Sequence, residues 1–221
     1  MRKLVVAAFV TVDGVMQAPG TPEEDPTGGF DQGGWSVNYW DEMMGRAMGE
    51  VFGRPFDLLL GRRTYEIFAA HWPYVEDDPA AALNSARKHV ASRTLRDLTW
   101  GNSTLLDGDA ADAVRRLKEE DGPDLVTQGS SELIQTLLEH DLVDELRVWT
   151  FPVLVGPGKR LFDRGTVPAG LELVDSATST TGVLMSTYRR VGEIQRGSFG
   201  LETPTEAEIE RRARLAAESQ A

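Results

Sequence analysis

The sequence predicts an α/β sandwich with a mainly parallel central sheet and antiparallel strands at its C-terminal end. Two observations support this fold class. Short apolar, β-rich runs alternate with segments of helical periodicity, which is the pattern of a parallel sheet covered by helices. The last two apolar runs, 171–177 and 183–191, are joined instead by a short Ser/Thr/Gly turn, which predicts an antiparallel pair.

The first half of the chain contains the longest predicted strand and the longest loop. Residues 4–12 (LVVAAFVTV) are continuously apolar, which is typical of a central strand covered on both faces. A Pro/Gly/Asp-rich loop covers 18–34, and such a length in a compact domain indicates a functional segment. The spacing of tryptophan and methionine then predicts a helix over 37–51.

The remaining elements alternate as expected for this fold class. Strands are predicted at 57–60, 88–92, 124–127 and 145–155, and helices at 64–70, after Asp109 and after Gly129. In the tail, Thr205 and Glu208 form a capping-box pattern that begins a charged helix. We therefore divide the chain into a domain of residues 1–191 and a tail of residues 192–221, and expect the tail helix to pack on the domain or on a neighbouring subunit.

Composition excludes several classes of function. With 221 residues, 41% of them hydrophobic, the chain can bury a full core, and no apolar run reaches the length of a membrane span. Its net charge of -12 disfavours nucleic acid and anionic membranes as partners. The absence of cysteine excludes disulfides and thiolate zinc sites, and the three histidines have no metal-binding spacing. We expect a cytoplasmic protein that binds a small molecule and no metal.

Three strand-to-helix turns carry the residues most suited to chemistry. They are Gly61-Arg62-Arg63-Thr64, Ser92-Arg93-Thr94 and Gln128-Gly129-Ser130-Ser131. Glycine permits close backbone approach, helix N-termini offer free N–H groups to phosphate, and arginine adds a planar donor fork. Because parallel strands end at one edge of a sheet, the three turns would meet there. Ordinary helix starts with solvated arginines remain an open alternative.

Neither common nucleotide-binding signature is present in the sequence. No predicted strand is followed by G-x-G-x-x-G. The segment 156–160 (GPGKR) lacks the first glycine and the Ser/Thr of a P-loop.

The order of LVVAAFVTVDG, LLLGRRTYE, HVASRTL, LVTQGSSELIQTLL and DLVDELRVWTFPVLVGPGKRLF resembles the dihydrofolate reductase-like superfamily. The most similar branch is the reductase domain of the riboflavin-biosynthesis deaminase-reductase and its stand-alone relatives. The resemblance covers residues 2–191 and implies a three-layer α/β/α sandwich, NADPH as cofactor, and a homodimer, which this branch often forms. Without cysteine, the chain cannot carry the zinc deaminase of the bifunctional enzymes.

The resemblance also implies a set of cofactor residues. Gly61, Arg62 and Thr64 would hold a cofactor phosphate, with Arg63 facing solvent. The adenosine end would meet Ser92, Arg93 and Thr94, and the diphosphate would meet Gly129, Ser130 and Ser131. The end of the first strand, from Phe9 to Thr11, would lie near the nicotinamide. Gln128 stands where this branch usually has a first glycine.

Candidate substrate residues come from the first turn and from the helix after the long loop. Thr11, Asp13 and Gly14 match the motif that borders the substrate pocket in the riboflavin branch, although a plain Asp-Gly turn is equally consistent. Asp41, or its neighbour Glu42, lies where a folate reductase keeps its substrate-binding carboxylate. Trp35 or Trp40 could stack on a flat heterocycle.

The resemblance makes 5-amino-6-(5-phosphoribosylamino)uracil the best candidate substrate. The long loop offers nothing for its phosphate, however, because residues 15–45 contain no lysine or arginine. A stand-alone relative with another heterocyclic substrate, dihydrofolate reduction, and a non-catalytic nucleotide-binding protein therefore remain alternatives.

Overall fold

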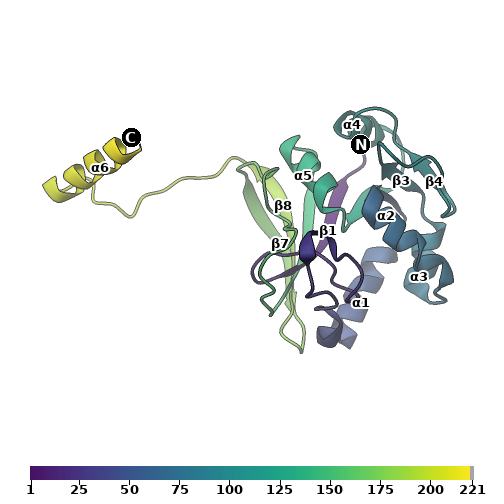
Figure 1. Ribbon diagram of the computed structural model, residues 1–221. Helices are drawn as coiled ribbons and strands as arrows, with labels where there is room; N and C mark the ends of the chain where they lie inside the picture. Colours follow the sequence, from purple (N-terminus) through teal and green to yellow (C-terminus); the bar gives the residue numbers. More distant parts are fainter. Residues whose placement is uncertain (220–221) are drawn as a thin grey trace.

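A computed structural model describes residues 1–219 of the chain, and its centre is one eight-stranded sheet (Figure 1). The strands are β1 (Leu4–Thr11), β2 (Phe56–Gly61), β3 (Lys88–Ala91), β4 (Ser103–Leu105), β5 (Asp124–Gln128), β6 (Glu145–Phe151), β7 (Gly170–Thr178) and β8 (Leu184–Gly192). The helices are α1 (Glu42–Phe52), α2 (Arg62–Ala69), α3 (Asp78–Ser85), α4 (Ala110–Glu119), α5 (Ser131–Glu139) and α6 (Glu206–Glu218).

The sheet has the order β4-β3-β2-β5-β1-β6-β8-β7, and its first six strands run parallel. β8 is antiparallel to β6, and β7 is antiparallel to β8. The mainly parallel sheet with antiparallel C-terminal strands is therefore confirmed. In this order β5 lies between β2 and β1, so the carboxyl ends of β3, β2, β5 and β1 are neighbours along one edge.

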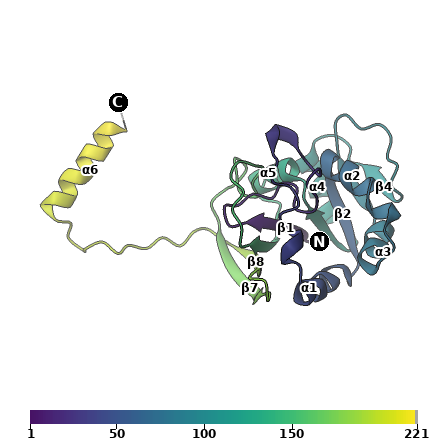
Figure 2. The ribbon, with the colours of Figure 1, turned by 60° about the horizontal axis from the view of Figure 1, so that its bottom comes forward.

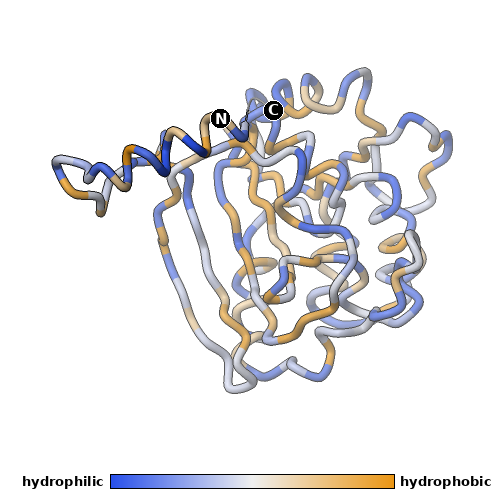
Figure 3. Tube along the Cα trace, turned by 60° about the vertical axis from the view of Figure 1, so that its left-hand side comes forward, coloured by the Kyte–Doolittle hydropathy of each residue, from blue (hydrophilic) through white to orange (hydrophobic). Residues whose placement is uncertain are grey.

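Alternation along β1 explains the three layers, because successive side chains of a strand point to opposite faces. Leu4, Val6, Ala8 and Val10 join the core formed with α4 and α5. Val5 joins the core formed with α2 and α3 on the other face, where α1 and the long loop cover a third cluster around Phe151. Figures 1 and 2 show this sandwich, and in Figure 3 the hydrophobic stretches gather in the central strands.

Four details differ from the sequence prediction. The helix expected over 37–51 begins only at Glu42, because 37–39 form a separate 3-10 turn. The strand expected over 145–155 ends at Phe151, directly before Pro152, which has no N–H for a sheet ladder. The helix α3 and the short strand β4 were not predicted.

A fifth difference concerns the tail helix. Thr205 caps α6 by accepting a hydrogen bond from the Glu208 N–H, as the capping-box pattern predicted. The expected packing of α6 on its own domain is absent, since none of its described residues is buried and Figures 1 and 2 both show it apart from the sandwich. No helix within residues 1–219 combines the length and the apolar composition needed to cross a membrane.

Candidate functional site

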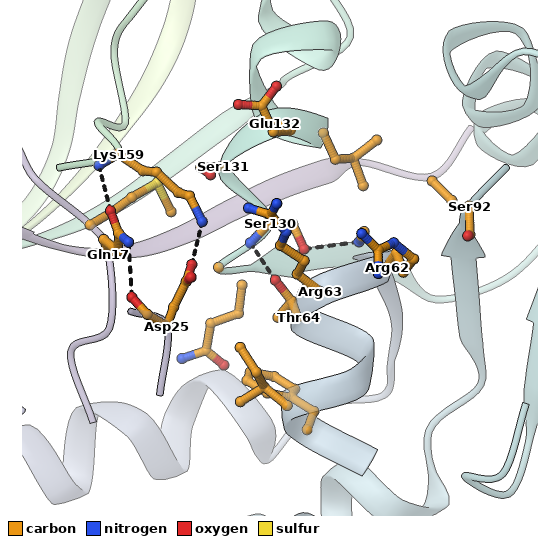
Figure 4. Close-up of a pocket in the computed structure, with 18 of the residues that line it drawn as sticks. Gln17, Asp25, Arg62, Arg63, Thr64, Ser92, Ser130, Ser131, Glu132 and Lys159 are labelled. Atoms are coloured by element: carbon orange, nitrogen blue, oxygen red, sulfur yellow. Dashed lines mark hydrogen bonds and ion pairs between the residues drawn. The ribbon is translucent and has the colours of Figure 1, made fainter. Parts of the chain in front are cut away.

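A cavity of about 1320 Å³ lies at the edge where β3, β2, β5 and β1 end. Its volume exceeds the roughly 300–1,000 Å³ of a typical small-molecule pocket. Figure 4 shows how the turns after these strands face the long loop across the cavity. Ligands of open α/β sheets bind at this type of position, where neighbouring strands diverge.

All ten predicted cofactor residues line this one cavity. They are Phe9, Gly61, Arg62, Thr64, Ser92, Arg93, Thr94, Gly129, Ser130 and Ser131. They come from four segments of the chain, and parallel strand order is what brings them together. Gln128, which replaces a glycine of the riboflavin branch, lines the cavity as well and leaves the turn intact.

The turn after β5 is held close to the start of α2. Gly129 has a φ of +67°, and a Cβ at this position would lie 3.0 Å from the Thr64 Cγ2 atom, so only glycine fits without displacement. Ser130 also takes the left-handed conformation, with φ 56° and ψ 44°. Its N–H donates to Thr64 Oγ1 at 2.7 Å, and its Oγ accepts from the Gly61 N–H at 2.9 Å.

These hydroxyl groups therefore do not cap their own helices. Thr64 and Ser130 each bond across to the neighbouring turn instead. In the described part of the chain, α1, α3, α4 and α6 each begin with an Asp or Thr side-chain cap, whereas α2 and α5 have none. The two uncapped N-termini both open onto the cavity, where their free N–H groups can receive an anion.

Positive charge is concentrated in the cavity despite the acidic chain. Arg62, Arg63, Arg93, Lys159 and Arg164 all line it. Three of these are paired with carboxylates: Arg62 with Glu66 at 3.2 Å, Lys159 with Asp25, and Arg164 with Glu132. Among residues 1–219, Arg63 and Arg93 make no ion pair, which leaves them as the charges available to a ligand.

The long loop forms the opposite wall of the cavity, and its acidic residues were missed by the sequence prediction. Burial raises the pKa of Glu24, whose carboxylate accepts hydrogen bonds from the Gly20 and Thr21 N–H groups. Burial acts to raise the pKa of Asp25 too, but hydrogen bonds from Lys159 and Thr27 outweigh it and the pKa is lowered. Glu24 and Asp25 both line the cavity.

Asp13 is not among the cavity residues, contrary to its predicted catalytic role. Its carboxylate accepts from Thr11 Oγ1 at 2.5 Å and from the Gly156 N–H at 2.8 Å, and these bonds, the one from Thr11 first, lower its pKa. Thr11 is buried and Gly14 lies at the adjoining turn, and neither lines the cavity. This motif fastens the end of β1 to the loop at 155–156.

Asp41 and Trp35 also have structural positions outside the cavity. The Asp41 carboxylate caps α1 through the Met44 N–H and accepts from the Thr180 N–H and Oγ1, each at 2.7 Å. Trp35 is buried, packs edge-on against Phe151 and donates its indole N–H to the Gln17 carbonyl. Neither the Asp41 carboxylate nor the Trp35 ring therefore lines the cavity.

No group of three or more His, Cys, Asp or Glu side chains within residues 1–219 is arranged to hold a metal ion.

Comparison with known proteins yields one family. The family model for the RibD C-terminal domain matches residues 2–185. The uncharacterized protein YyaP of Bacillus subtilis is 27% identical over 192 residues, covering 85% of this chain and 94% of that protein.

Two solved structures share the fold. A candidate riboflavin biosynthesis protein from Shewanella sp. PV-4 is 21% identical, with a TM-score of 0.61, and the match covers 86% of this chain and 99% of that one. A pyrimidine reductase-like protein from Corynebacterium diphtheriae is 14% identical, with a TM-score of 0.52, and the match covers 87% and 93% of the two chains.

Proposed function

This chain belongs to the RibD C-terminal domain family, and from that premise we propose that it is an NADPH-dependent reductase of a small heterocyclic substrate. The observation that carries the proposal is the pair of uncapped helix N-termini. α2 and α5 begin side by side on one cavity, cross-linked by Thr64 and Ser130, and both present free N–H groups to it. This is a site for an extended ligand with several phosphates.

Each turn has a distinct task in this proposal. The close approach of Gly129 to Thr64 leaves backbone facing the cavity, which suits the diphosphate of a dinucleotide. Arg93 carries a free guanidinium beside Ser92 and Thr94, which suits the additional phosphate of NADPH. Phe9, at the end of β1, forms the floor where the nicotinamide would lie.

When bound, NADPH supplies the hydride. The protein has to orient the acceptor carbon against it and exclude water. Phe9 stacks on Trp149 at a centroid distance of 5.2 Å and is therefore fixed as a flat, apolar surface. The long loop closes the cavity opposite α2 and would keep the substrate on this surface.

The best candidate substrate is 5-amino-6-(5-phosphoribosylamino)uracil. Family membership supports it, and so does the pyrimidine reductase-like description of one structural neighbour. Dihydrofolate reduction has less support. The Asp41 carboxylate, the candidate for contacting a pterin, already accepts hydrogen bonds from the Met44 N–H at the start of α1 and from the Thr180 N–H.

The test is a fluorescence titration with NADPH and NADH, followed by NADPH oxidation assays with the pyrimidine substrate and with dihydrofolate. We expect NADPH to bind more tightly than NADH. Arg93→Ala should lower the affinity for NADPH by about 10- to 100-fold, the loss expected when a charged hydrogen bond is removed. The affinity for NADH should stay nearly unchanged. Arg115→Ala, on the exposed face of α4, is the matched control.

The outcomes separate the alternatives. Absence of NADPH binding would exclude both reductase functions. NADPH binding without turnover of either substrate would identify a nucleotide-binding protein or a reductase of another heterocycle. If Arg93→Ala lowers the affinities for NADPH and NADH equally, Arg93 contacts a part of the cofactor that both molecules share.

A further inference from the structure

The two adjacent arginines at the start of α2 have different surroundings. Arg62 Nη1 pairs with Glu66, one turn further along the same helix, at 3.2 Å. Arg63 instead extends to the long loop, where its Nη1 donates to Thr27 Oγ1 at 3.3 Å. Because Arg63 has no carboxylate partner in residues 1–219, it is the arginine of this pair whose charge is uncompensated. Arg63 is exposed, as expected, and its guanidinium is also directed to the hydroxyl group of the long loop.

A second cation also donates to the Thr27 hydroxyl group. Lys159 follows β6 by several residues, and its Nζ donates to Thr27 Oγ1 at 2.8 Å and to the Asp25 carboxylate. Arg63 and Lys159 therefore converge on one oxygen atom, although they lie far apart in the sequence. Figure 4 shows Arg63 and Lys159 extending into the pocket from two sides.

The loop that brings Thr27 to this place is firmly anchored. Gln17 is only 4% exposed, and its Nε2 donates to the carbonyls of Asp25 and Thr27, each at 2.9 Å. Its Oε1 accepts from the Lys159 N–H at 3.0 Å. One buried side chain thus fixes the backbone of both segments that carry the cluster.

The charge of the cluster is incompletely balanced. Among residues 1–219, Asp25 is the one carboxylate bonded to the cluster, and it already accepts from Lys159 and from Thr27 Oγ1 at 2.5 Å. Two cations with one anion leave a net positive charge in this group of bonded side chains. An oxyanion placed between Arg63 and Lys159 would remove this imbalance and gain charge-assisted hydrogen bonds.

We propose that Arg63 and Lys159, which meet at Thr27, form a second oxyanion subsite, distinct from the two helix N-termini assigned to the cofactor, which binds a phosphate or carboxylate group of the substrate. The oxyanion subsite is inferred from the geometry of the cluster alone. That the oxyanion belongs to the substrate rests on the proposed function. It supplies the basic residues that the long loop lacks in its own sequence. The oxyanion displaces the Thr27 hydroxyl from Arg63 and keeps Asp25 bonded to Lys159.

The experiment is isothermal titration of NADP⁺-saturated protein with methyl phosphate and, separately, with acetate. We expect at least one probe to bind, and Arg63→Gln and Lys159→Gln each to weaken it by about 10-fold or more. Arg63 is exposed, so its replacement should leave the fold intact, and the melting temperature checks this. Arg115→Gln is the control. If methyl phosphate binds more tightly than acetate, the subsite is specific for phosphate. If acetate binds more tightly, the subsite is specific for carboxylate.

Two results would overturn the subsite. One is the absence of binding by either probe to the NADP⁺-saturated protein. The other is an Arg63→Gln variant that loses NADP⁺ affinity but binds the probes as the wild type does, which would assign Arg63 to the cofactor. If the wild type fails to bind NADP⁺, the proposed function falls. The same titrations on the protein without NADP⁺ then test the subsite alone. The probes should again bind more weakly to Arg63→Gln than to the wild type.

Discussion

The Ser130 N–H donates to Thr64 Oγ1 at 2.7 Å, so the first turns of α5 and α2 are held in one fixed relation. The reciprocal bond from the Gly61 N–H to Ser130 Oγ completes this link at 2.9 Å. Both bonds join backbone of one turn to a side chain of the other. The two uncapped helix starts therefore face the cavity as one rigid surface, and a ligand that spans both does not have to order them.

Replacing Thr64 with valine tests this relation. Valine keeps the shape of the side chain but removes the acceptor, which leaves the Ser130 N–H without its partner at a cost of about 1–3 kcal/mol. We expect NADPH and NADH affinities to fall together by about 10-fold, because the change disorders a turn that faces the part shared by both cofactors. Thr104→Val, at an exposed position of β4, is the control. Unchanged affinities in Thr64→Val would show that the link does not organise the site.

Asp41 is expected to act on stability and not on turnover. Its carboxylate joins the N-terminus of α1 to the hairpin between β7 and β8, and Asp41→Ala removes both connections. We expect the melting temperature to fall by several degrees while NADPH affinity stays unchanged. Asp41→Asn, which can still cap α1, should recover part of the loss. A variant with normal stability and reduced turnover would restore the catalytic role.

The pH dependence of this contribution follows from the direction of the pKa shift. Hydrogen bonds from the Met44 backbone and then from Thr180 lower the pKa of Asp41. Its stabilising effect is therefore present above the pKa of about 3.9 in the unfolded chain, and is lost as the pH falls through the lower folded value. The difference in melting temperature between wild type and Asp41→Ala should accordingly shrink at strongly acidic pH.

The cofactor turns could be predicted from the sequence because their signals are local. A glycine or serine directly after an apolar strand marks the turn, and parallel strand order then determines which turns meet. Lys159 gave no such signal, since its partner Asp25 is 134 residues away in the chain. The bonding of Asp13 and Asp41 could not be predicted for a related reason. Each bonds to backbone more than 130 residues distant, at Gly156 and Thr180, and no local pattern shows that a carboxylate is occupied in this way.

A buried ion network at the opposite edge of the sheet should dominate the stability of the N-terminus. Asp57 pairs with Arg2, both nearly inaccessible to solvent, and lies 3.3 Å from His89 Nε2. Asp57→Ala leaves the Arg2 charge buried without its partner, so we expect a loss of about 3–5 kcal/mol in the free energy of unfolding. Urea denaturation measures this, with the exposed Asp97→Ala as control. A loss as small as that of the control would mean that Arg2 finds sufficient compensation in the Pro123 carbonyl.

Lys88 should make the protein more stable in mildly alkaline solution than at neutral pH. The side chain is fully buried, its Nζ donates to the Asn84 carbonyl at 2.7 Å and lies 4.2 Å from the centre of the Trp100 ring, and no carboxylate within residues 1–219 pairs with it. Burial lowers the pKa of Lys88 to about 8, whereas the unfolded chain keeps a value of about 10.4. Between these two values the unfolded state binds more protons than the folded state, so stability rises with pH across this window.

Lys88→Met should therefore stabilise the protein at pH 7 and remove the rise above pH 8. At 1.36 kcal/mol for each pKa unit, the gain is at most about 3 kcal/mol, and the attraction between Lys88 and the Trp100 ring face reduces it. Urea denaturation of wild type and variant from pH 7 to pH 10 measures both effects. Lys3→Met, at a largely exposed position, should leave the pH profile unchanged. If the free energy of unfolding of the wild type does not change from pH 7 to pH 10, the folded protein stabilises the Lys88 ammonium to the same extent as water does.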